Sequence, residues 1–147
     1  PGTGDIQLSL SQSVAVSGAV IVTTPQDVAL LDARKGIEMF RKVNVPILGV
    51  VENMGVHICS NCGHSEAIFG EGGGKKLAND YGVEVIGSLP LDLSIREHTD
   101  SGNPIVVAQP DGAVAKAYRA LAERVVQKVE GLSASKPVQP TISMTDD

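Results

Sequence analysis

The chain has 147 residues, a net charge of −5, and 42% hydrophobic and 20% charged residues, which is ordinary for one soluble globular domain with a packed core. The acidic balance argues against a general nucleic-acid-binding protein, which would present a basic face. No apolar run approaches the roughly 20 residues that cross a bilayer, and no signal peptide is recognisable at the amino end. Two cysteines do not make a secreted disulfide framework, so we expect a cytoplasmic protein with reduced thiols and neither nucleic-acid nor membrane partners.

Strand-like and helix-like segments alternate along the chain. Residues 6–17 fit the pattern of a strand and that of a helix equally well. After them, short β-branched apolar runs predict buried strands, and apolar residues spaced by three and four predict amphipathic helices. The alternation predicts an α/β fold with a mostly parallel sheet flanked by helices. The predicted strands are 19–23, 46–51 and 83–87, and 104–108 is predicted as a short strand or extended segment. The predicted helices begin at Thr24-Pro25, with Thr24 as cap, at Lys75 and at Asp92. A final predicted helix covers 114–129.

Two segments lack this periodicity. Residues 52–74 are rich in glycine and contain both cysteines, which is typical of a loop, and we expect its glycine run 72–74 to act as a hinge. Residues 133–147 are rich in Ser, Pro, Thr and Asp, a composition that does not bury a core. We therefore expect a folded portion over 1–132 and a flexible tail over 133–147.

Three short polar or turn-forming segments fall at the carboxyl ends of predicted strands. They are Thr23-Thr24-Pro25, Glu52-Asn53-Met54 and Leu89-Pro90-Leu91-Asp92. In open parallel sheets, ligands bind at the carboxyl ends of the strands. We therefore expect one binding site, built by several loops, at that edge of the sheet.

Cys59 and Cys62 are the only cysteines in the chain. A tetrahedral thiolate site for zinc, or an iron–sulfur cluster, usually takes four ligands, so this pair is half a site. The residues leave three interpretations open. The same pair on a second copy of the chain completes the site across a two-fold axis, or His57 or His64 completes a zinc site within one chain. The third is a redox dithiol, although such motifs usually open a helix and no helix start is apparent here.

Five short motifs occur in a fixed order along the chain. They are Pro1-Gly2-Thr3-Gly4-Asp5, Val22-Thr23-Thr24-Pro25-Gln26, Val51-Glu52-Asn53-Met54, Cys59-x-x-Cys62-Gly63 and Leu89-Pro90-Leu91. Together they resemble the Mrp/ApbC family of iron–sulfur cluster carrier ATPases, relatives of MinD within the deviant P-loop NTPases. The resemblance covers roughly residues 1–132. Each motif alone is modest, and the ordered set is specific.

The resemblance implies that the chain is the carboxyl-terminal half of the family's ATPase domain. In the family, the stretch that matches residues 1–5 is the switch II loop near the γ-phosphate. The Walker A loop and the Walker B aspartate lie upstream of it, and this sequence contains neither. Because a P-loop and its lysine cradle the phosphates, we expect no ATP hydrolysis by this chain alone and no catalytic residue within it. ATP and magnesium are the expected ligands of the full-length protein.

The resemblance also implies which residues contact the nucleotide. Gly2 and Gly4 would let the backbone approach a phosphate. The family's matching asparagine hydrogen-bonds adenine, which implies this role for Asn53, because an amide can pair with a donor and an acceptor of the base together. Pro90 and Leu91 match a loop that borders the base. From the residues alone, Asn53 also fits a turn-forming asparagine, and Pro90 and Leu91 fit a strand-ending turn.

For the cysteines, the resemblance implies a labile [4Fe-4S] cluster held by Cys59 and Cys62 from each chain of a homodimer, a site that zinc also fits. The expected function is an iron–sulfur cluster carrier that transfers its cluster under ATP control, with apo iron–sulfur proteins and cluster scaffold proteins as partners. Two rivals stay open. One is a MinD-like partitioning ATPase without metal, which does not need the C-x-x-C pair, and the other is a structural zinc-bridged dimer.

Overall fold

The computed structural model describes residues 4–134, so Gly2 and residues 135–147 of the expected tail lie outside the described residues. Residues 6–13 of the ambiguous region are helical, since they belong to α1, and residues 14–17 lie outside any helix or strand. In chain order the elements are α1 (Asp5–Ser13), β1 (Ala19–Thr23), α2 (Asp27–Lys42), β2 (Ile47–Glu52), β3 (His57–Ile58), β4 (Ser65–Glu66), α3 (Gly73–Tyr81), β5 (Val85–Ser88), α4 (Leu93–Asp100), α5 (Ile105–Ala108) and α6 (Ala113–Ala134).

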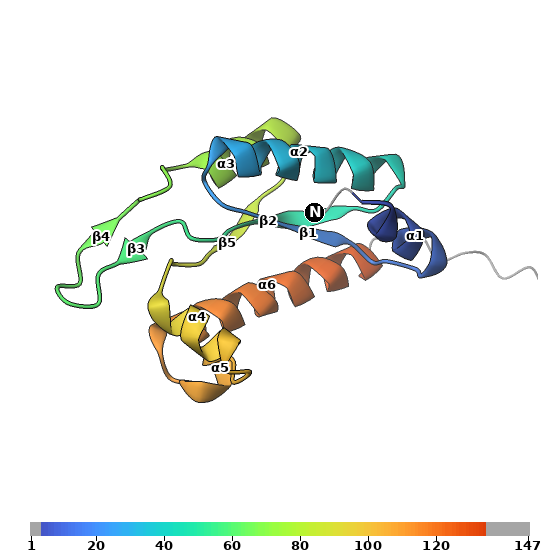
Figure 1. Cartoon of the computed structure of the whole chain (residues 1–147). Helices are drawn as coiled ribbons and strands as arrows, with labels where there is room; N and C mark the ends of the chain where they lie inside the picture. Colours follow the sequence, from blue (N-terminus) through green and yellow to red (C-terminus); the bar gives the residue numbers. More distant parts are fainter. Residues whose placement is uncertain (1–3, 135–147) are drawn as a thin grey trace, which may run out of the picture.

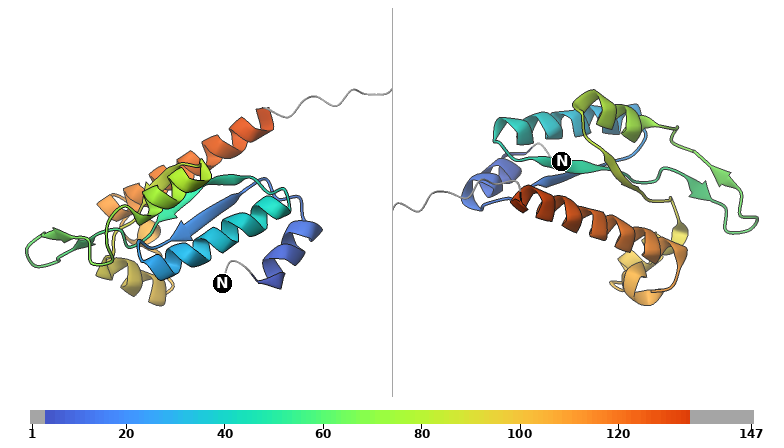
Figure 2. Two further views of the ribbon diagram at one scale, coloured as in Figure 1. Left: turned by 90° about the horizontal axis from the view of Figure 1, so that it is seen from above. Right: turned by 180° about the vertical axis from the view of Figure 1, so that it is seen from behind.

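The main sheet has three parallel strands in the order β1-β2-β5. Helices α2 and α3 cover one face of this sheet, and α6 covers the other (Figure 1). The same layers are visible from behind in Figure 2. This arrangement confirms the predicted α/β fold with a parallel sheet flanked by helices, since parallel strands need crossover helices and bury both faces.

The core has one apolar cluster on each face of the sheet. Because successive side chains of a strand point to opposite faces, neighbouring residues Val50 and Val51 enter different clusters, and they are 0% and 1% exposed. The cluster under α2 and α3 includes Ile21, Leu30, Ile37, Val50, Leu77 and Ala78. The cluster under α6 joins Val51, Ile86 and Leu89 to half-buried Val20, Ala117, Tyr118, Leu121 and Val125.

The outer edge of β5 is covered by charged side chains of α6. Arg124 donates from Nη1 to the Ile86 carbonyl oxygen at 2.8 Å, and Lys128 forms an ion pair with Glu84. A hydrogen bond from the Lys128 ammonium, together with its charge, lowers the pKa of the Glu84 carboxyl. Charged groups over an edge strand discourage pairing with another chain, so β5 is protected as the end of the described sheet.

Two expected elements differ in the structure. Helix α2 begins at Asp27 with Gln26 as its N-cap, and Thr24 does not cap it but donates from Oγ1 to Gln26 Oε1 at 2.9 Å. The expected strand or extended segment 104–108 is the short helix α5, because the amides of Val107 and Ala108 both donate to the Pro104 carbonyl oxygen. A short apolar run cannot be assigned to strand or helix from periodicity alone.

Helix α6 extends past residue 129, at which the predicted helix ends, and runs to Ala134. Within residues 4–134, no helix combines the length and the apolar character that crossing a membrane requires.

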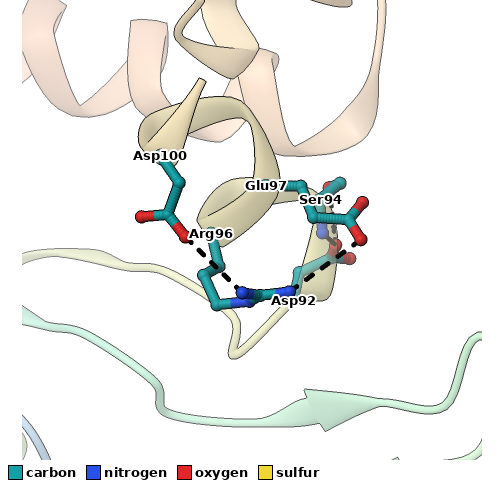
Figure 3. A network of polar contacts seen from close by, with 5 residues as sticks. All are labelled: Asp92, Ser94, Arg96, Glu97 and Asp100. Carbon is teal, nitrogen blue, oxygen red and sulfur yellow. Dashed lines mark hydrogen bonds and ion pairs between the residues drawn. The ribbon is translucent and has the colours of Figure 1, made fainter. Parts of the chain in front are cut away.

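Asp92 anchors the loop that leaves β5. It is the N-cap of α4, as predicted, and its Oδ1 accepts hydrogen bonds from the Ser94 amide at 2.8 Å and from Ser94 Oγ at 2.5 Å (Figure 3). Arg96 forms exposed ion pairs with Glu97 and Asp100 on the same helix, and such pairs contribute little to stability. The cap therefore determines how the chain turns from Leu91 into α4.

Replacing Asp92 by alanine is expected to lower the free energy of unfolding by about 1 kcal/mol, the usual effect of losing an N-cap side chain. Urea unfolding followed by circular dichroism measures this change. Asp92→Asn is the matched control, because an asparagine oxygen still accepts from the Ser94 amide and should retain most of the stability. Equal midpoints for wild type and Asp92→Ala would show that the cap contributes nothing.

Candidate metal centre and nucleotide-facing edge

The two cysteines lie at the tip of a small β-hairpin. The predicted loop 52–74 contains strands β3 and β4, which pair antiparallel with His57 opposite Glu66 and Ile58 opposite Ser65. The hairpin extends from the sheet at the end where β2 and β5 finish (Figures 1 and 2). The thiols therefore belong to a projection that stands away from the core.

Backbone hydrogen bonds hold the cysteine turn in a tight conformation. The Cys59 amide donates to the His64 carbonyl oxygen at 2.9 Å, and the Gly63 amide donates to the Cys59 carbonyl oxygen at 2.8 Å. Gly63 has φ +70°, a left-handed conformation that favours glycine. No helix begins at Cys62, so the turn lacks the helix start that redox C-x-x-C motifs usually have.

The turn also stabilises negative charge on one sulfur. The pKa of the Cys59 thiol is lowered, first by a hydrogen bond from the Cys62 amide and then by one from the Asn61 amide, while desolvation opposes the shift. Hydrogen bonds to the charged form of a group favour that form, and the thiolate is the form that binds metal. Both cysteines are free thiols, with Cys62 exposed and Cys59 half-buried.

One chain supplies only the two thiols. Among residues 4–134, no group of three or more His, Cys, Asp or Glu side chains is placed to hold a metal ion. His57 instead points Nδ1 at the Leu91 carbonyl oxygen, 3.2 Å away, and His64 is exposed. A zinc site completed by either histidine within one chain is therefore not formed, and the donor set fits half of a four-thiolate site.

Asn53 and the loop after β5 lie together at the carboxyl end of the sheet, as expected. The backbone amide of Asn53 donates to the Thr23 carbonyl oxygen at 2.7 Å. The side-chain oxygen Oδ1 of Asn53 accepts from the backbone amide of Met54 at 3.0 Å. The Leu89 amide donates to the Glu52 carbonyl oxygen at 2.9 Å. Pro90 and Leu91 follow directly, so the two expected base-bordering segments are neighbours.

Gly4 is not brought to this edge. It is the N-cap of α1, and α1 lies at the opposite end of the sheet from the β3–β4 hairpin (Figures 1 and 2). Leu8 of this helix lines a surface pocket with residues of the second half of α2, among them Met39 and Lys42. The described structure therefore gathers Asn53, Pro90 and Leu91, and leaves Gly4 apart from them.

Glu52 belongs to a segment that the sequence places at this edge, but its contact with α3 was not predicted. Its Oε2 accepts from the Gly74 amide at 2.7 Å, which places a carboxylate at the amino end of α3, where the helix dipole favours it. A Cβ on Gly74 would lie 2.8 Å from Glu52 Oε2, and one on Gly73 would lie 2.7 Å from the Pro25 carbonyl oxygen. The glycine run expected to be a hinge thus provides a closely packed helix start at Gly73 and Gly74, and no sequence pattern pairs these residues with Glu52.

Comparison with solved structures places the fold in the class of MinD-like nucleotide-binding α/β proteins. A nucleotide-binding protein in complex with ADP from Archaeoglobus fulgidus matches with a TM-score of 0.64 at 38% identity, over 76% of this chain and 45% of that chain. The cell division ATPase MinD of Pyrococcus furiosus matches with a TM-score of 0.59 at 29% identity, over 76% of this chain and 43% of that chain.

The family is shown by the sequence itself. The model of the family described as ParA, NUBPL iron-transfer P-loop NTPase, matches residues 1–126, and the chain belongs to this family. This confirms the resemblance inferred from the five motifs.

Several curated relatives are similar over most of this chain. The iron-sulfur cluster carrier protein of Pseudomonas fragi is 69% identical over 83% of this chain, that of Escherichia coli K12 is 58% identical over 88%, and the iron-sulfur cluster transfer protein NUBPL of mouse is 56% identical over 88%. The chain spans less than half the length of these relatives, namely 42%, 35% and 41%.

Proposed function

We propose that this chain is the cluster-binding part of an iron–sulfur cluster carrier, and that Cys59 and Cys62 from each of two chains hold one cluster between them. The observation that carries the proposal is the hydrogen-bonded turn that presents two free thiols at a hairpin tip, with no third ligand among residues 4–134. Two such turns related by a two-fold axis supply the four thiolates that a [4Fe-4S] cluster takes.

The position of the thiols suits a cluster that is passed on to another protein. Cys62 is exposed and the hairpin stands away from the core, so a bound cluster is accessible to an acceptor. The names of the curated relatives, cluster carrier and cluster transfer proteins, support cargo of this kind. The proposed partners are a second copy of the chain, apo iron–sulfur proteins and cluster scaffold proteins. The proposed location is the cytoplasm.

ATP control is the second part of the proposal. Binding of ADP by the Archaeoglobus fulgidus protein and the membership of a P-loop NTPase family support a nucleotide at the edge formed by Asn53, Pro90 and Leu91. An approach of Gly2 and Gly4 to its phosphates is proposed for the full-length protein alone, because Gly4 lies apart from this edge in the described structure. We propose that residues 1–132 form one portion of the ATPase domain and that 133–147 are a tail.

Cluster transfer tests the proposed function. The full-length protein is reconstituted anaerobically with iron and sulfide, mixed with an apo ferredoxin, and followed by the visible spectrum of the acceptor with and without Mg-ATP. Transfer that ATP alters is the expected result. Protein that binds zinc but never iron and sulfide would favour the structural zinc dimer, and dimerisation on ATP without any metal would favour a partitioning ATPase.

The isolated 147-residue chain is expected to show no ATPase activity, because its sequence lacks the P-loop backbone and lysine that cradle the phosphates. Phosphate release from ATP, measured against a boiled sample and against the full-length protein, checks this. If the isolated chain released more phosphate than the boiled sample, the hydrolytic residues would lie within this chain, and the prediction would be wrong.

A further inference from the structure

A ladder of backbone hydrogen bonds joins the nucleotide-facing loop to the base of the cysteine hairpin. The ladder continues the β2–β5 pairing beyond the sheet: the Leu89 amide donates to the Glu52 carbonyl oxygen at 2.9 Å, and the Gly55 amide to the Leu89 carbonyl oxygen at 3.1 Å. The Leu91 amide then donates to the Val56 carbonyl oxygen at 2.7 Å. Three backbone hydrogen bonds therefore join residues 52–56, which turn at Met54 (φ +58°), to residues 88–91.

His57 ends this ladder with its side chain. It forms an isolated parallel bridge with Leu91, and its Nδ1 lies 3.2 Å from the Leu91 carbonyl oxygen, a half-buried contact between residues 34 positions apart. A carbonyl oxygen only accepts, so this contact is a hydrogen bond in the tautomer that has its proton on Nδ1. His57 is also the first residue of β3, which has two residues and leads directly to Cys59.

We propose that His57 is a positioning residue that couples the occupancy of the nucleotide edge to the conformation of the Cys59–Cys62 turn. This inference rests on the proposed function, because it assigns a route for the ATP control stated there. A purine nucleotide held against Pro90 and Leu91 displaces or orders that loop, and the Nδ1–H···O bond transmits the change to β3. The short hairpin pairs only two residues of each strand, so its orientation depends strongly on this anchor.

Three substitutions of His57 separate the hydrogen bond from the shape of the side chain. In His57→Asn, the amide nitrogen stands the same number of bonds from Cβ as Nδ1 does, so the donor is retained. In His57→Gln the nitrogen is one bond further out and matches Nε2, so the donor is misplaced. His57→Phe keeps a ring and removes the donor. His98→Phe is the matched control on α4, since His98 contacts Gln109 and lies outside the ladder.

The readouts are the rate of thiol alkylation by iodoacetamide in the metal-free full-length protein and the rate of cluster transfer from the loaded protein, each with and without Mg-ATP. We expect ATP to change both rates of the wild type about fivefold or more, the lower end of ordinary coupling between sites. His57→Asn and His98→Phe should keep this response, and His57→Gln and His57→Phe should lose it. Nucleotide affinity and circular dichroism should match the wild type in all four variants.

Among the variants, two results overturn the inference: a full ATP response in His57→Gln and His57→Phe, or its loss in His57→Asn with folding and nucleotide affinity intact. A wild type without any ATP response in alkylation also overturns it, and the carrier function then stands or falls on whether the cluster still binds and transfers. Failure of the coupling and failure of the proposed function are therefore distinguishable.

Discussion

Replacing Cys59 by alanine is expected to abolish cluster binding by the full-length protein. Each chain contributes two thiols and no third ligand within residues 4–134, so the substitution removes half of the ligands from both sides of a two-chain site. After anaerobic reconstitution, iron should fall from about four per dimer, the content of one [4Fe-4S] cluster, to background, and the broad visible absorbance should disappear. Cys62→Ala is expected to behave in the same way.

Ser60→Ala is the control for this experiment. Ser60 is an exposed residue of the same turn, and the backbone hydrogen bonds that hold the turn join other residues. It should bind as much iron as the wild type. A Cys59→Ala dimer that still holds a cluster would show that the bridging arrangement is wrong. Loss of iron in Ser60→Ala as well would show that the assay reports the turn's conformation and not its ligands.

Replacing Leu77 by alanine is expected to destabilise the core strongly. Leu77 is 0% exposed and packs in the cluster with Leu30, Ile37 and Val50 beneath α2 and α3. Removal of a buried leucine side chain costs the transfer free energy of its methyl groups and leaves a cavity, together about 2–5 kcal/mol. Urea unfolding of the full-length protein measures the loss.

Leu31→Ala is the matched control for Leu77→Ala. It makes the same chemical change on α2 at a side chain that is 60% exposed, so the free energy of unfolding should change by about 0.5 kcal/mol or less. Equal losses for the two variants would contradict the position assigned to the core.

Leu77→Ala should also loosen α3, the helix that carries Leu77. Because α3 begins at the glycine run that contacts Glu52, hydrogen exchange at the Gly74 amide should rise in this variant.

The strands of the main sheet could be predicted because burial on both faces leaves continuous β-branched runs. Ala19–Thr23 and Ile47–Glu52 agree with the predicted ranges within a residue or two, and Val85–Ser88 overlaps its range. The segment 104–108 was predicted wrongly, since its apolar run is too short to show a period. Tertiary packing favours the helical conformation of this segment, because Ile105 is buried. Pro104, which has no amide hydrogen, also suits a helix start.

Part of the candidate site also follows from the sequence. The thiol pair is recognisable because no other cysteine competes with it, and Asn53 and Leu91 share an edge because parallel strands end together. The contacts of Glu52 with Gly74 and of His57 with Leu91 could not be predicted. They join residues 22 and 34 positions apart, and they depend on the register of a hairpin whose two-residue strands have no periodic signal.

The central claim is that two chains hold one cluster through their hairpin thiols. Native mass spectrometry of the anaerobically reconstituted full-length protein tests it most directly, because the mass counts chains, iron and sulfide together. The account predicts a species of two chains with about four irons and four sulfides, which dissociates into metal-free single chains when the cluster is chelated. A single chain that carries a complete cluster, or a two-chain species that never takes up iron, would contradict it.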